Sequence, residues 1–223
     1  MSAPLQVGQY SAGGTSSPHT VAFTGVTAGS ALAVFVSFSL TGAPTLSVSD
    51  DVNGAWTLIG RVDDVPLNQG VALYGRTNSA AGDLTVSFGA SPGRYLCMFA
   101  AEWGGADTSS PFADWAGAVD ATGSSDADAL TSGDMTLASG TGTVFALCLD
   151  NLTGDPPAAG TGYTSIAAAW GFNDSSNPGA DPYARATYRD VAAGDHEATF
   201  TGASGNGSRR RGHHQGCGRG WWR

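Results

Sequence analysis

The sequence predicts an all-β fold: a two-sheet antiparallel β-sandwich of about twelve strands, of the jelly-roll or immunoglobulin-like type. Apolar and polar residues alternate with a period of two, and clusters of Gly, Asn, Asp, Ser and Pro separate the alternating runs. No window of a dozen residues has helical periodicity. Hydrophobic residues make up 41% of the chain and charged residues 13%, a composition typical of a folded protein.

The clearest predicted strand is residues 30–40, where every second residue from Leu32 to Phe38 is large and apolar. Segments 94–103 and 143–150 are apolar on both faces, so we expect them to be interior strands. Further strands are expected at 5–10, 19–24, 45–49, 55–62, 70–77, 83–88, 134–138, 164–169, 183–190 and 196–201.

The stretch "DVNGAW" gives the sharpest hairpin signal, because Asn53 and Gly54 suit the two positive-φ positions of a type I′ turn. Composition does not change before residue 207. We therefore expect one β-sandwich domain over residues 1–207, followed by a basic tail rich in Arg, Gly, His and Trp over residues 208–223.

Charge divides the chain in the same way. Up to residue 207 nineteen acidic residues face five arginines, a net charge of −14, whereas residues 208–223 carry five arginines and no acid. An acidic body repels phosphate, so we expect no nucleic-acid partner for the main domain. No stretch reaches the roughly 20 apolar residues of a membrane span, and "MSAPLQVGQY" has no signal-peptide pattern. These features favour synthesis in a host cytoplasm without a cleaved leader.

Three stretches occur in a familiar order: "LSVSDDVNGAWTLIG", "GVALYGRTNSAAGDLTVSF" and "YLCMFAAEWGGADTSSPFA". Together they resemble a β-sandwich module of bacteriophage structural proteins (tail or decoration proteins) and of bacterial surface proteins. In those modules the hairpin reads Gly-Asn, whereas here Asn53 precedes Gly54. The resemblance covers roughly residues 5–201. It implies a jelly-roll or immunoglobulin-like sandwich used for assembly or adhesion, and it brings no catalytic residues.

The carboxylates are the first candidates for catalytic groups, since a carboxylate pair is the simplest catalytic device on a sandwich. Glu102 follows a predicted central strand and is interpreted either as a general acid or as a carboxylate that bonds a neighbouring loop. Asp107 lies in the next loop, not at a strand offset from Glu102. His19 and His196 are isolated on predicted strands, so we expect surface or hydrogen-bonded histidines. We assign no catalytic, cofactor or metal residue.

The acidic stretch "SDDVNG" lacks the ligand spacing of an EF-hand, and the hairpin accounts for Asp50, Asp51 and Asn53 without an ion. A single Ca²⁺ between this and another acidic loop stays an alternative. Cys97 and Cys148 lie in apolar runs, as buried thiols or as a pair that bridges two strands.

Aromatic side chains near predicted loops are candidates for glycan contact. Trp56 and Trp103 are expected in the core, because they lie in or beside strands. The candidate glycan-contact aromatics are Trp115, Trp170, Phe172 and Tyr183, for which core packing is the competing interpretation.

The tail "SRRRGHHQGCGRGWWR" has three interpretations. Its arginines and tryptophans suit a polyanion-binding arm, and His213, His214 and Cys217 give three of the four ligands of a closed zinc site. The third is a frameshifted terminus, because the next reading frame permits a β-strand that the resembling modules have at this place. A shifted tail is expected to lie on the surface or dangle, leaving one sheet position open or filled by a neighbouring subunit.

The sequence therefore predicts a non-enzymatic virion structural, decoration or tail-associated protein that acts through self-assembly or surface adhesion. Its expected partners are copies of itself or neighbouring virion proteins, and a cell-surface glycan is a further candidate. The alternatives are a carbohydrate-binding or adhesion module on the extracellular surface of a bacterium, and a sandwich-fold glycan hydrolase. The first would display aromatics on one face, and the second would have facing carboxylates in a cleft.

Overall fold

The computed structural model describes residues 3–12, 18–40, 42–65, 68–91, 96–109, 111–120, 129–150, 157–166, 170–171, 183–201 and 215–222. Over these residues the chain is built of antiparallel strands, as the sequence predicts. Eighteen strands are described, against about twelve expected, because several of the additional elements are only two or three residues long. Within the same residues no helix is long and apolar enough to cross a membrane.

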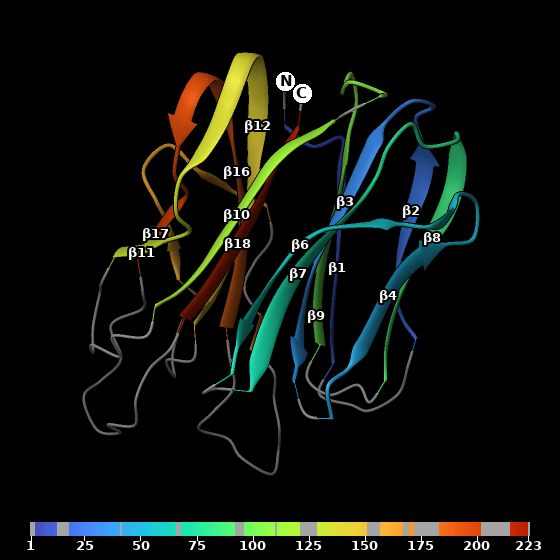
Figure 1. The fold of residues 1–223 in the computed structure, drawn as a ribbon. Coiled ribbons are helices and arrows are strands. Elements are labelled where there is room, and N and C mark those ends of the chain that lie inside the picture. Colours follow the sequence, from blue (N-terminus) through green and yellow to red (C-terminus); the bar gives the residue numbers. More distant parts are fainter. Residues whose placement is uncertain are drawn as a thin grey trace.

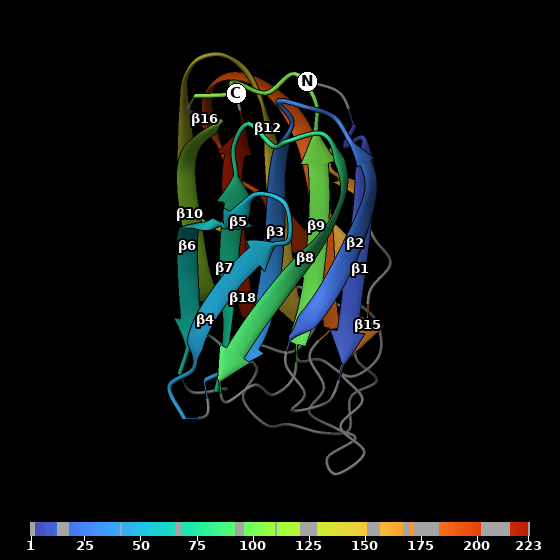
Figure 2. The same ribbon diagram turned by 90° about the vertical axis from the view of Figure 1, so that its right-hand side faces the viewer.

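The first half of the chain forms two sheets. The five-stranded sheet has the order β1 (Gln6–Ala12), β9 (Leu96–Trp103), β3 (Ala31–Ser39), β7 (Gln69–Arg76) and β6 (Thr57–Asp64). The four-stranded sheet has the order β2 (His19–Val26), β8 (Gly82–Ser91), β4 (Thr45–Asp50) and β5 (Gly54–Ala55). Figure 2 looks onto the four-stranded sheet, whose longer strands cross in front of the five-stranded one.

The second half forms the other two sheets. The six-stranded sheet has the order β10 (Phe112–Asp120), β18 (Gln215–Trp222), β12 (Met135–Asp150), β16 (Tyr183–His196) and β14 (Thr164–Ser165), with β15 (Trp170–Gly171) also paired to β16. A three-stranded sheet joins β11 (Ala129–Thr131), β17 (Thr199–Thr201) and β13 (Ala158–Ala159). Figure 1 shows the five-stranded sheet between the four-stranded and six-stranded sheets.

The five-stranded sheet is covered on both faces, which corrects the two-sheet expectation. One face of β3 carries Leu32, Val34 and Val36 into a core shared with the four-stranded sheet. The other face carries Ala33 and Phe35 into a second core shared with the six-stranded sheet. All nine residues of β3 are buried, because a strand that is apolar on both faces needs a layer on each side.

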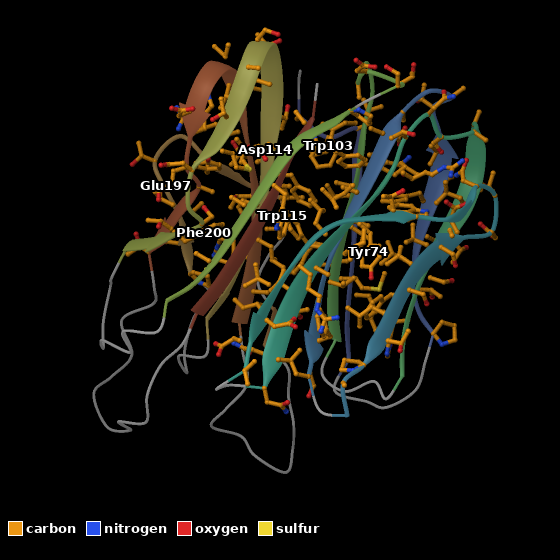
Figure 3. All side chains as sticks on the ribbon, viewed as in Figure 1. Tyr74, Trp103, Asp114, Trp115, Glu197 and Phe200 are labelled. Atoms are coloured by element: carbon orange, nitrogen blue, oxygen red, sulfur yellow. The ribbon has the colours of Figure 1, made fainter. Side chains whose placement is uncertain are left out.

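Three cores therefore lie in series, and Figure 3 labels a residue of each. Tyr74 belongs to the core under the four-stranded sheet, and Trp103 to the core between the five-stranded and six-stranded sheets. Phe200 belongs to a third core on the far face of the six-stranded sheet. The interior-strand expectation for 94–103 and 143–150 is confirmed where side chains are described: Met98–Trp103 and Thr143–Leu149 are buried.

Glycines let the two halves pack closely. A Cβ atom on Gly60 would lie 2.2 Å from the Trp115 ring, and one on Gly75 would lie 1.8 Å from the Phe112 ring. Both rings come from β10, and both glycines lie on strands of the five-stranded sheet. Because Gly60 and Gly75 lack side chains, each leaves a space (a socket) that the Trp115 or Phe112 ring fills.

Filling a socket should destabilise the fold. Gly75→Ala places a methyl group inside the Phe112 ring, so we expect the free energy of unfolding to fall by about 2 kcal/mol in urea titrations. Gly104→Ala is the matched control, because its Cβ would meet only the end of the exposed Leu5 side chain at 2.9 Å. Equal stability of both variants would contradict the close-packing argument.

Candidate functional site

The β4–β5 hairpin is organised by the buried Asp50 carboxylate. Its Oδ1 accepts bonds from the backbone N–H groups of Val52 (2.8 Å) and Asn53, and its Oδ2 accepts the indole N–H of Trp56 at 2.7 Å. Only Gly54 of the predicted turn pair has a positive φ, 79°. The type I′ expectation is therefore wrong, because the Asp50 carboxylate fixes the turn by accepting the N–H groups of Val52 and Asn53.

Asn53 extends this hairpin to two other connections. Its Nδ2 donates to Ser79 Oγ at 3.2 Å, and its Oδ1 accepts the N–H of Ala80 at 2.9 Å. Ser79 in turn donates its backbone N–H to the carbonyl of Ser30 at 2.9 Å. A polar network thus runs from the hairpin through the segment after β7 to the β2–β3 connection.

Glu102 lies at the other end of the network and is 1% exposed. Its Oε1 accepts the N–H of Thr27 at 2.9 Å and the hydroxyl of Ser30 at 2.7 Å, and its Oε2 accepts Gln6 Nε2. All three donors are neutral and belong to neighbouring segments. This geometry matches the loop-bonding interpretation of Glu102, and Asp107 accepts bonds from Ser109 in its own exposed loop.

The same contacts bear on the calcium alternative. Both oxygens of Asp50 already face N–H donors, and Asp51 Oδ1 accepts the N–H of Thr85 at 2.8 Å. Oxygens that point at N–H hydrogens are badly placed for a cation, which prefers oxygen ligands. Among the described residues no three His, Cys, Asp or Glu side chains gather closely enough to hold a metal ion.

Of the candidate glycan-contact aromatics, Trp115 is the one whose side chain the structure describes. Trp115 packs in the core between the halves, with its ring centroid 6.2 Å from that of Phe35 (Figure 3). Trp170 and Tyr183 lie on the adjacent strands β15 and β16, where Trp170 pairs with Ala184 and Tyr183 with Gly171. Phe172 lies outside the described residues.

His19 departs from the expectation of a surface or hydrogen-bonded histidine. It is 1% exposed, and neither ring nitrogen has a hydrogen-bond partner among the described residues. Its ring lies against Tyr10, with centroids 5.1 Å apart. Burial lowers the pKa of His19, because the charged imidazolium would lose its hydration. His196, in contrast, lies 2.8 Å from the carbonyl of Ala192 through Nε2, as a hydrogen-bonded histidine should.

The C-terminal strand β18 is the feature that sequence reasoning missed. Residues 215–222 pair antiparallel with β10 on one side and with β12 on the other. The expectation that the tail dangles or leaves a sheet position open is therefore wrong for these residues, and a strand in this position weighs against the frameshift hypothesis. His213, His214 and Arg209–Arg211, on which the zinc and polyanion interpretations depend, lie outside the described residues.

The glycine alternation of β18 fits its position. Gly216, Gly218 and Gly220 pair with Leu149, Leu147 and Phe145, which face the core between the halves. Cα atoms of β18 come within 8 Å of Cα atoms of β6 and β7, closer than the ~10 Å typical of stacked sheets. This close approach favours residues without a side chain at these three positions.

No family model matches the sequence, and no curated protein or solved structure does so either. The candidate site is therefore defined by geometry alone. It is the sheet position between β10 and β12, which we call the β18 slot, together with the strand that fills it.

Removing the Asp50 carboxylate should leave several buried N–H donors without an acceptor. We expect Asp50→Ala to lower the free energy of unfolding by about 3 kcal/mol, because the Trp56 indole and two backbone amides lose their acceptor. Asp51→Ala is the control and should cost about 1 kcal/mol or less, since it removes one exposed bond. Denaturant titrations of both variants test this, and similar losses would contradict it.

Stability should fall as the pH is lowered through the range in which histidine titrates in the unfolded chain. The folded-state pKa of His19 is below its ordinary value of 6.5, so below about pH 6.5 the unfolded chain binds a proton that the folded chain refuses. We expect His19→Phe to flatten the decline between pH 7.5 and 5.5, measured by thermal unfolding. A slope that survives in His19→Phe would contradict this assignment.

Proposed function

We propose that this protein is a structural module that self-assembles, as a decoration or tail-associated component of a bacteriophage particle. The observation that carries the proposal is the β18 slot, a position inside a sheet that is filled by the last strand of the chain. The resemblance of roughly residues 5–201 to phage structural modules supports the particle context.

The slot supports assembly because β18 is held on both sides by strand pairing. A β18 strand from a second copy would make the same pairs with β10 and β12, so exchange between copies changes no contact within the sheet. Residues 202–214, thirteen in number, join β17 to β18. Thirteen extended residues span up to about 45 Å, which sets the limit on how far β18 can lie from the body of its own copy.

Charge favours the same exchange. The body of the chain up to residue 207 has a net charge of −14, whereas residues 208–223 have a net charge of +5. A basic terminal segment is attracted by the acidic body of any copy, and this attraction raises the local concentration of β18 strands.

The length of the connection provides the test. A shorter connection favours exchange of β18 between copies over its return to the same copy, so we expect deletion of residues 203–208 to lower the apparent dissociation constant of the oligomer roughly tenfold in sedimentation experiments. Inserting six Gly and Ser residues at the same place is the matched control and should favour the monomer.

Two results would overturn the proposal. One is a monomer at all concentrations for the wild type and the deletion variant alike. The other is turnover of a glycan that is lost in Glu102→Gln, which would indicate a hydrolase.

A further inference from the structure

We propose that Cys148 and Cys217 form a redox pair whose oxidation fixes β18 covalently in the β18 slot. The two residues are direct Cα partners in the pairing of β12 with β18. This inference does not rest on the proposed function, since it concerns a bond within one chain.

The register brings the cysteines within bonding range. Directly opposed residues of antiparallel strands have Cα atoms about 4.5 or 5.5 Å apart. Both values lie within the range of roughly 4.4–6.8 Å that disulfides span. The backbone pairing of β12 with β18 therefore sets Cys148 and Cys217 opposite each other.

Cys148 cannot bridge to Cys97 in this arrangement. It belongs to the core on the far face of the six-stranded sheet, together with Val144 and Phe200. Cys97 lies on β9 of the five-stranded sheet, which packs against the opposite face. The Cys97–Cys148 alternative is therefore removed, and the sheet offers Cys217 instead.

The Cys148 side chain is buried, and its Sγ lies 3.8 Å from the carbonyl oxygen of Leu149. Oxidation needs a reagent such as oxidised glutathione. One cysteine thiolate attacks the reagent and releases one molecule of glutathione thiol, and the second thiolate attacks the mixed disulfide and releases another. The two cysteines lose two protons and two electrons, and the reagent disulfide is reduced to two thiols.

Burial of Cys148 gives this chemistry a direction. Cys148 is buried, so we expect a small disulfide to react with it before β18 is paired and the protein disulfide to close once β18 is paired. The bond encloses the residues between positions 148 and 217, a loop long enough for a large effect on the unfolded chain. Oxidation therefore adds a covalent link to the seated strand, and after reduction β18 is held by strand pairing alone.

The test uses the full chain, refolded with and without oxidised glutathione, followed by iodoacetamide and peptide mass mapping. We expect one alkylated cysteine of three, Cys97, and a linked peptide pair that contains Cys148 and Cys217. The oxidised protein should unfold roughly 5–10 °C above the reduced one.

Single variants distinguish this pair from the two pairings that would involve Cys97. Cys97→Ser is the matched control and should keep both the linked peptides and the thermal shift, whereas Cys148→Ser and Cys217→Ser should lose both. Three alkylated cysteines after oxidation, or a linked peptide that contains Cys97, would overturn the proposal. Neither result depends on whether the protein forms oligomers, so the two proposals fail separately.

Discussion

Burial of the five-stranded sheet on both faces is the constraint on which the rest of the structure depends. Its central strand β3 has no exposed residue, so each face requires a covering layer. The four-stranded sheet covers one face with residues such as Phe88, and the six-stranded sheet covers the other with Phe145 and Leu147. The six-stranded sheet contacts the five-stranded sheet directly, because the Phe145 ring centroid lies 4.6 Å from that of Phe35 and 5.0 Å from that of Trp103.

Sequence periodicity predicted the strands better than the layers. Alternation identified β2, β3, β4, β7 and β8 close to their observed bounds. It also showed strands that are apolar on both faces, which a two-layer sandwich cannot cover, because one face of each of its sheets meets solvent. β10 was missed because "FADWAGAVD" is rich in Ala and Gly, whose small side chains hide the alternation. β18 was missed because glycine is disfavoured in isolated strands, and only the close approach of β6 and β7 gives it a reason.

Several of the acidic residues before residue 207 have a structural role that the local sequence does not reveal. Several carboxylates accept main-chain N–H groups from distant segments: Asp51 from Thr85, Asp83 from Gly25, and Glu102 from Thr27. A charged acceptor strengthens such bonds, and it needs no basic partner. The partners are dozens of residues apart in the chain, so the sequence alone showed which residues were acidic but not what they held.

The division of the sheets along the chain has a mechanical consequence. Every strand ladder among the described residues lies either within residues 6–103 or within residues 112–222, and the two groups meet through side chains such as Trp115 on Gly60. Side-chain contacts break after a small separation of the two halves. A strand ladder pulled along its strands is stronger, because many backbone hydrogen bonds must break at the same time. A pulling force applied across this boundary would therefore part the molecule into two intact sheet pairs before either unravels.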